Sequence, residues 1–215
     1  MARNVSRDTW RRRAPREAQR EGRGGAGGPR APMLRDLKRS GELAYSKLEK
    51  VNSEFFSLTY GAVVTQVLRD YEDASAASVQ LEKMGYNIGM RLVDEMLAKA
   101  GVGACQSFSE TAEVIAKVGF KMFLGIGVEV VGASASEFTL QLAENPLAEF
   151  VELPEEYAKL EYSGMLCGVI RGALEMLQMR VVCTLTKDVL WGDETTEIKV
   201  VLKEILDEEY HDDEG

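Results

Sequence analysis

The chain has 215 residues, of which 45% are hydrophobic, so it is long enough to bury one core of single-domain size. Its net charge of −9 is unevenly distributed, because residues 1–33 carry nine Arg against three acidic residues, a charge of +6, which leaves −15 for the rest. The acidic remainder excludes broad binding of nucleic acid or anionic membranes through the folded surface, since both need clusters of Lys and Arg.

Four segments differ in composition along the chain. Residues 1–33 are rich in Arg, Gly and Pro and lack periodic apolar positions, which predicts a disordered basic arm. Residues 34–52 are expected to be a helical extension or linker, 53–206 an α+β domain and 207–215 an acidic tail. No apolar run approaches the roughly 20 residues of a membrane-spanning helix, and we expect a cytoplasmic protein.

Apolar residues recur every three or four positions in four segments, which predicts four helices. Their expected bounds are Ser53–Tyr71, Ser75–Lys99, Ser107–Leu124 and Tyr162–Leu177. The third opens with the capping-box spacing of Ser107 and Glu110, and Gly101 and Gly125 supply stop signals.

Between and after the last two helices the hydrophobic period changes to two, which predicts strands. They are expected at residues 128–131, 138–142, about 181–189 and 197–205, with the last two joined as a hairpin around Trp191. The element order ααα-ββ-α-ββ predicts an α+β fold, with the helices on one side of a small antiparallel sheet of about four strands.

Nothing in the sequence indicates an active site or a metal site. The three cysteines, Cys105, Cys167 and Cys183, are too irregularly spaced for a zinc site or a disulfide framework. The only histidine, His211, lies in the acidic tail, so no Cys/His or Ser/His catalytic pair can form in the domain. We therefore expect a protein that is not an enzyme and that needs no metal or cofactor.

Several ordered blocks resemble the subunit 3 branch of the small-subunit family of the trafficking protein particle (TRAPP) complex. The blocks are Leu58-Thr59-Tyr60-Gly61-Ala62, Lys83-Met84-Gly85-Tyr86-Asn87-Ile88-Gly89, Glu110-Thr111-Ala112-Glu113-Val114-Ile115-Ala116-Lys117-Val118, Asn145-Pro146-Leu147, Phe150-Val151-Glu152-Leu153-Pro154 and Leu166-Cys167-Gly168-Val169-Ile170-Arg171-Gly172-Ala173-Leu174-Glu175-Met176. The likeness spans roughly residues 53–205.

This resemblance implies a non-catalytic core subunit of a vesicle tether that acts between endoplasmic reticulum and Golgi. It implies pairing with other TRAPP subunits, peripheral location at the cis-Golgi and endoplasmic reticulum, and support of nucleotide exchange on a Rab-type GTPase by the assembled complex. The alternative is a free carrier protein that binds an acyl chain. RNA binding through the basic arm is the least supported function, and no nucleic-acid partner is expected.

The family also carries a buried acyl chain, palmitate, on one cysteine, and that position matches Cys105. The neighbours Ala104 and Gln106 depart from the basic residue and histidine that often flank it in the family. Because Cys105 precedes a helix N-terminus, the helix dipole is expected to favour its thiolate. The face expected to line the acyl channel comprises Phe108, Ala112, Ile115, Ala116, Gly119, Met122 and Phe123.

The resemblance also suggests where partners bind. Because the family pairs through its first helices, the expected partner interface comprises Phe56, Tyr60, Val64, Tyr71, Met84 and Ile88. The acidic residues Asp207, Glu208 and Glu209 are expected to contact the GTPase. Arg171 is expected to pair with Glu175, four residues later on the same helix.

Overall fold

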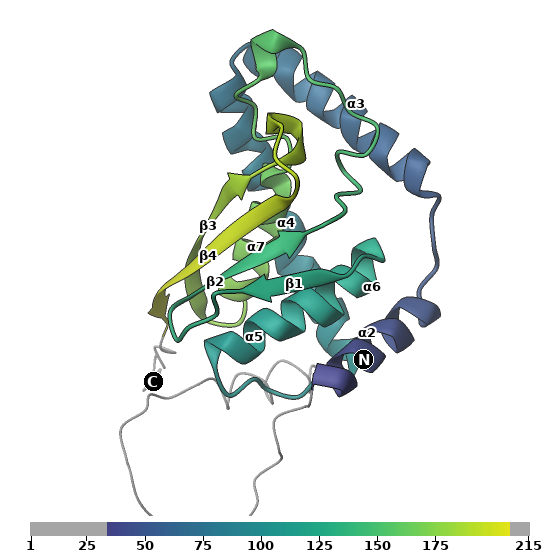
Figure 1. Cartoon of the computed structure of the whole chain (residues 1–215), viewed down its shortest axis with the longest axis vertical. Helices are drawn as coiled ribbons and strands as arrows, with labels where there is room; N and C mark the ends of the chain where they lie inside the picture. Colours follow the sequence, from purple (N-terminus) through teal and green to yellow (C-terminus); the bar gives the residue numbers. More distant parts are fainter. Residues whose placement is uncertain (1–33, 207–215) are drawn as a thin grey trace, which may run out of the picture.

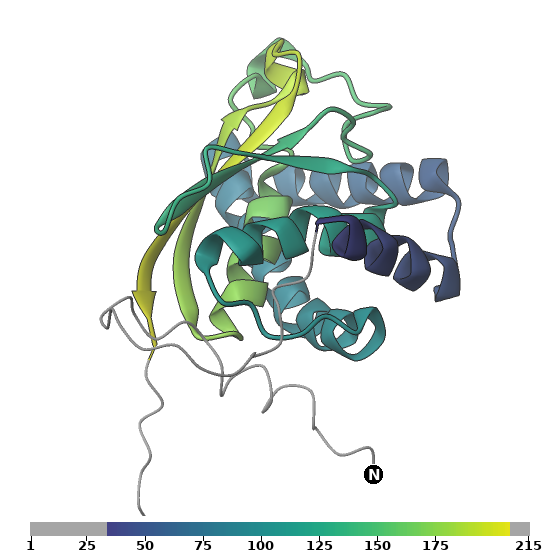
Figure 2. The same ribbon diagram turned by 60° about the horizontal axis from the view of Figure 1, so that its bottom comes forward.

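The computed structural model describes residues 34–206 and places the helices on one face of a four-stranded antiparallel sheet (Figures 1 and 2). The helical elements are α2 (Leu34–Lys47), α3 (Ser53–Tyr71), α4 (Ala74–Ala100), α5 (Phe108–Val114), the π-helical turn η1 (Ile115–Gly119), α6 (Phe120–Leu124), η2 (Glu155–Tyr157), α7 (Gly164–Glu175) and η3 (Val189–Trp191). The strands are β1 (Val128–Val131), β2 (Glu137–Leu142), β3 (Met179–Lys187) and β4 (Thr196–Ile205). The predicted fold class is confirmed.

The sheet has the strand order β1-β2-β4-β3, and every neighbouring pair is antiparallel. Alternate residues of β2 are buried, with Phe138, Leu140 and Leu142 facing the helices. This alternation is the period expected of a strand with one covered face. The strands therefore form a wall against which the helices pack.

Side-chain caps explain where three helices begin. Asn52 accepts a hydrogen bond from the Phe55 amide, and Asp73 accepts one from the Ala76 amide. Ser107 accepts one from the Glu110 amide at 3.1 Å, while the Glu110 carboxylate accepts from the Gln106 amide. The predicted capping box therefore forms, with its return bond one residue earlier than in the standard motif.

The predicted third helix is continuous but not uniformly α-helical, because η1 forms a single π-turn between α5 and α6. A π-turn holds one more residue than an α-turn, so it rotates everything that follows relative to a straight helix. Hydrophobic periodicity alone did not indicate this insertion.

Helices α4 and α7 form the closest pair in the molecule. Glycines of each helix meet the backbone of the other: Gly85 and Gly89 face α7, and Gly168 and Gly172 face α4. Arg171 of α7 joins the two helices through an ion pair with Glu82 of α4. Two guanidinium nitrogens of Arg171 donate to the two carboxylate oxygens of Glu82, at 2.6 and 3.0 Å. The expected pair with Glu175 is present at 4.0 Å, but Glu82 is the nearer partner of Arg171.

The predicted basic arm (residues 1–33) and the acidic tail (residues 207–215) lie outside the described residues, and so do Asp207, Glu208 and Glu209. Within residues 34–206, no helix combines the length and the apolar character needed to cross a membrane. The same residues contain no cluster of three or more His, Cys, Asp or Glu side chains able to hold a metal ion.

Candidate functional site

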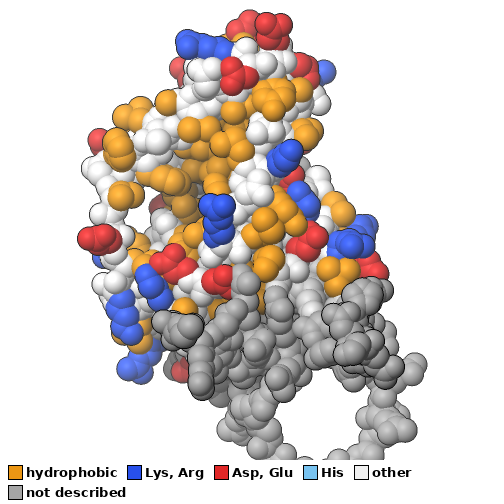
Figure 3. Space-filling model, turned by 180° about the vertical axis from the view of Figure 1, so that it is seen from behind, with side chains coloured by type: hydrophobic (Ala, Val, Ile, Leu, Met, Phe, Trp, Pro, Cys, Tyr) orange, Lys and Arg blue, Asp and Glu red, His pale blue; other side chains and the backbone are white. Residues whose placement is uncertain are grey.

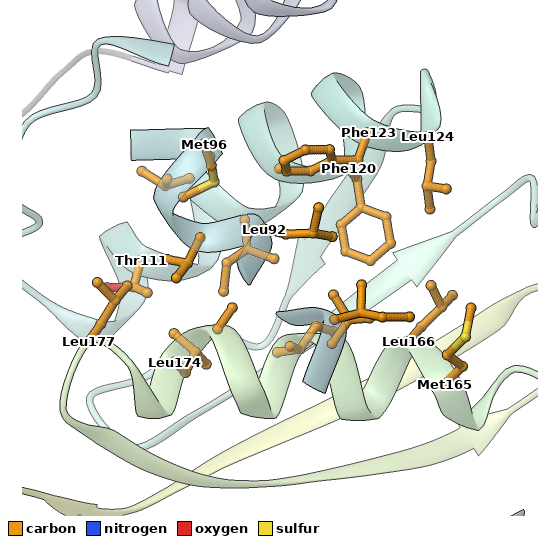
Figure 4. Close-up of a pocket in the computed structure, with 18 of the residues that line it drawn as sticks. Leu92, Met96, Thr111, Phe120, Phe123, Leu124, Met165, Leu166, Leu174 and Leu177 are labelled. Carbon is orange, nitrogen blue, oxygen red and sulfur yellow. The ribbon is translucent and has the colours of Figure 1, made fainter. Parts of the chain in front are cut away.

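An apolar pocket of about 360 Å³ lies between the α4–α7 pair on one side and α5, η1 and α6 on the other (Figure 4). Its lining residues are Phe56, Ile88, Leu92, Val93, Met96, Thr111, Val114, Ile115, Gly119, Phe120, Phe123, Leu124, Leu147, Met165, Leu166, Val169, Ile170, Ala173, Leu174 and Leu177. Among these described residues only Thr111 has a polar side chain. The pocket therefore suits a hydrocarbon ligand and offers almost nothing to a polar one.

The two ends of the pocket differ in exposure. Thr111, Leu174 and Leu177 lie together at one end in Figure 4, and all three are buried. Leu124 and Met165 lie toward the other end and are partly exposed. A long, narrow ligand would thus have one end deep in the protein and the other near solvent.

Cys105 does not itself line the pocket, but its thiol lies beside the side chain of Thr111, which does. Only 3% of Cys105 is exposed, and this burial raises the pKa of its thiol to about 12, with a smaller increase from the Glu110 carboxylate. The predicted thiolate is therefore wrong. The dipole of the helix that begins at Phe108 does not offset the loss of hydration, which is the largest cause of the raised pKa.

Comparison with known proteins shows which family this chain resembles in sequence. Residues 56–201 match the family model described as transport protein particle (TRAPP) component. The chain belongs to the TRAPP family.

Its curated TRAPP relatives match over most of their own length. The chain is 56% identical to trafficking protein particle complex subunit 3 of Dictyostelium discoideum over 177 residues, which cover 81% of this chain and 95% of that protein. It is 46% identical to the BET3 subunit of Saccharomyces cerevisiae, covering 81% of this chain and 93% of that protein. Among solved TRAPP structures, subunit 3 of Naegleria fowleri is described as covalently bound to palmitic acid; it matches with 55% identity and a TM-score of 0.71, over 74% of this chain and 100% of that one.

The TRAPP fold brings only part of the predicted channel face into the pocket. Ile115, Gly119 and Phe123 line it. The other four predicted residues are buried but do not line this pocket: Phe108, Ala112, Ala116 and Met122. Phe108, for example, packs its ring against Phe138 of the sheet, with ring centroids 4.8 Å apart.

The π-turn η1 explains the error at Met122, whereas Phe108 and Ala112 precede the turn and lie on a different face of α5 from the pocket-lining Thr111. Thr111, Val114 and Ile115 face the pocket before the turn, and a straight α-helix would continue this face through Val118 and Met122. The extra residue of η1 instead brings Gly119, Phe120, Phe123 and Leu124 to the pocket. The α4 and α7 walls of the pocket were not part of the predicted channel, and Ile88 of α4 was expected at a partner interface instead.

The predicted partner interface likewise mixed two faces of α3 and α4. Tyr60 and Val64 are 5% and 3% exposed, so they cannot contact a partner, and that part of the prediction was wrong. An amphipathic helix turns its apolar stripe to its own core, which the prediction did not allow for. Phe56 and Ile88 line the pocket, Met84 packs against the core and Tyr71 is exposed.

The exposed apolar residues of this region are different ones. Phe55, Leu58 and Val79 are 68%, 65% and 66% exposed on α3 and α4. Figure 3 shows apolar side chains gathered on the side of the molecule opposite the view of Figure 1. Large exposed apolar side chains in one region are typical of a surface that another protein covers.

Proposed function

We propose that this chain is a non-catalytic core subunit of a TRAPP vesicle-tethering complex that acts in transport from endoplasmic reticulum to Golgi. Family membership and the names of its relatives support this role. As a subunit it would sit in the cytoplasm, peripherally at the cis-Golgi and endoplasmic reticulum. It would support nucleotide exchange on a Rab-type GTPase through the assembled complex, with Asp207, Glu208 and Glu209 near the GTPase.

We propose further that Cys105 carries a long-chain acyl group, such as palmitate, that extends through the pocket. The observation that supports this most strongly is that the buried Cys105 lies beside Thr111, whose side chain lines the otherwise apolar pocket. The Naegleria relative, described as bound covalently to palmitic acid, supports the same assignment. Burial at about 0.8 kcal/mol per CH₂ would stabilise the bound chain by up to ~10 kcal/mol before the cost of ordering it.

The chemistry of loading follows from the environment of the thiol. The Cys105 sulfur would attack the carbonyl carbon of an acyl thioester such as acyl-CoA, forming the new C–S bond as the old one breaks. The thiol proton then passes to the departing thiolate of the donor, so the exchange is balanced. Because burial raises the pKa of Cys105, the thiol stays protonated at neutral pH and must lose its proton during the attack.

Partner subunits would cover the outer face of α3 and α4. Besides Phe55, Leu58 and Val79, this region has a groove of about 570 Å³ between α3 and residues 150–157, where Phe150 is 52% exposed. Tyr71 of α3 and Ile88 of α4 are exposed on the same two helices. We infer that sister subunits, as a homodimer or heterodimer, bury these surfaces in the complex.

Size-exclusion chromatography of native cell lysate tests the subunit role. The chain should elute far above its own 23.8 kDa, together with other TRAPP subunits identified by mass spectrometry. Substituting Leu58→Glu on the exposed face should shift it toward small species, because a carboxylate would then be buried at the interface. Elution of the unaltered chain at its own mass would instead favour the free acyl carrier.

A further inference from the structure

Helix α2 lies before the family-matched region and packs on the back of the pocket wall, beside η1 and α6 (Figure 1). Its buried face consists of Leu37, Gly41 and Ala44. None of the three lines the pocket. Helix α2 is therefore separated from the pocket by η1 and α6, which form the wall between them.

The closest contact between α2 and η1 is made at Gly41. Glycine is unfavourable in the middle of a helix, so its position within α2 calls for a packing reason. Here the missing side chain lets α2 rest on the carbonyl oxygen of Lys117, the central residue of η1. A Cβ at Gly41 would overlap that oxygen and lie 3.3 Å from the Cβ of Lys121. The contact is thus made directly with the backbone of the π-turn.

Tyr45 makes a second contact where α6 ends. Its ring covers Gly125, whose φ of 74° closes the helix, and a Cβ there would lie 3.1 Å from the Tyr45 hydroxyl. The Lys121 and Lys50 ammonium groups lie 5.4 and 4.3 Å from the centre of the ring. Helix α2 thus holds both the π-turn and the end of the helix that follows it.

The π-turn is also held from the opposite side. The buried Lys117 side chain donates a hydrogen bond to the Val128 carbonyl of β1 at 2.6 Å and pairs with Glu129 at 2.9 Å. Isolated π-turns are rare and persist where tertiary contacts support them. Without the Gly41 contact, relaxation to an α-turn would rotate Gly119 out of the pocket wall and Val118 toward it.

We propose that α2 controls how tightly the pocket holds an acyl chain, because it keeps η1 in the register that presents Gly119 to the ligand. Gly41 and Tyr45 are positioning residues in this role, since neither touches the pocket. The inference rests on the proposed acyl-binding function and adds a regulatory element outside the region that the family model matches.

The test uses full-length Cys105→Ser protein made in bacteria, so that no covalent acyl group competes, and the fluorescent fatty acid cis-parinaric acid as probe. Gly41→Leu should weaken probe binding by about tenfold, and Tyr45→Ala, which introduces no clash, should weaken it in the same direction. Ser46→Leu on the exposed side of α2 should stay within about twofold of the reference. All affinities are measured at a temperature at which circular dichroism shows each variant folded.

A second control variant is destabilised at a site away from the pocket. It tests whether a loss of probe affinity arises from the position of η1 or from lower stability of the whole protein. Leu185→Ala removes a buried side chain from β3, so it should lower the melting temperature without changing probe affinity. If Gly41→Leu or Tyr45→Ala binds the probe as Ser46→Leu does, the inference is overturned; should Gly41→Leu fail to fold, Tyr45→Ala decides alone. No probe uptake by the reference protein would overturn the acyl-pocket assignment itself, and the role of α2 with it.

Discussion

Replacing Gly119 by leucine should empty the acyl pocket while leaving the protein folded. Gly119 lines the pocket from η1, and a Cβ there would lie 3.6 Å from the Met96 sulfur, which is an ordinary contact. The rest of the leucine side chain would project into a cavity of only about 360 Å³. We expect acyl occupancy in Gly119→Leu protein from eukaryotic cells to fall more than about tenfold, measured by intact mass spectrometry.

Gly127→Leu is the matched control, because a Cβ at Gly127 would meet no atom of residues 34–206 within 4 Å and the residue does not line the pocket. Its acyl occupancy should equal that of the unaltered chain. Equal occupancy in Gly119→Leu would mean that the acyl chain follows another path.

Gly168→Ala should be among the most destabilising single-methyl changes in the molecule. The added Cβ would overlap the carbonyl oxygen of Glu82 and lie 2.8 Å from the Tyr86 nitrogen, and both are backbone atoms of α4. Backbone cannot move aside as a side chain can, so the α4–α7 pair must separate. We expect a loss of about 3 kcal/mol or more in the free energy of unfolding, measured by urea denaturation.

Gly61→Ala in α3 makes the same chemical change where there is room. The new Cβ would lie 3.5 Å from the Tyr162 hydroxyl, and alanine favours helix over glycine by about 1 kcal/mol. This variant should therefore be as stable as the unaltered chain or slightly more stable. A similar loss in both variants would contradict this explanation, because it would show that overlap with the α4 backbone is not what makes Gly168→Ala destabilising.

The fold could be predicted from sequence because its elements have strong local signals. Helix α4 has an acidic N-cap, Asp73, and ends at Gly101, while β2 alternates apolar and polar residues. The family blocks added the position of Cys105. These features depend on residues near one another in the chain, which a sequence shows directly.

The site was harder to predict because its geometry depends on long-range contacts. The π-turn η1 is stabilised by Gly41 from α2 and by the link from Lys117 to β1, and neither contact has a periodic signature. It changes which residues beyond the turn face the pocket, so Gly119 and Phe123 line the pocket and Met122 does not. Phe108 and Ala112 precede the turn, and there the prediction took the wrong face of α5. The pKa of Cys105 depends likewise on burial by distant segments, which a helix-dipole argument does not include.

We infer that the pocket holds an acyl chain attached to Cys105. Intact mass spectrometry of the full-length protein purified from eukaryotic cells, before and after neutral hydroxylamine, tests it most directly. We expect a mass increase of one long-chain acyl group that hydroxylamine removes and that Cys105→Ser lacks. An unmodified mass, or an adduct that remains on Cys105→Ser, would contradict it.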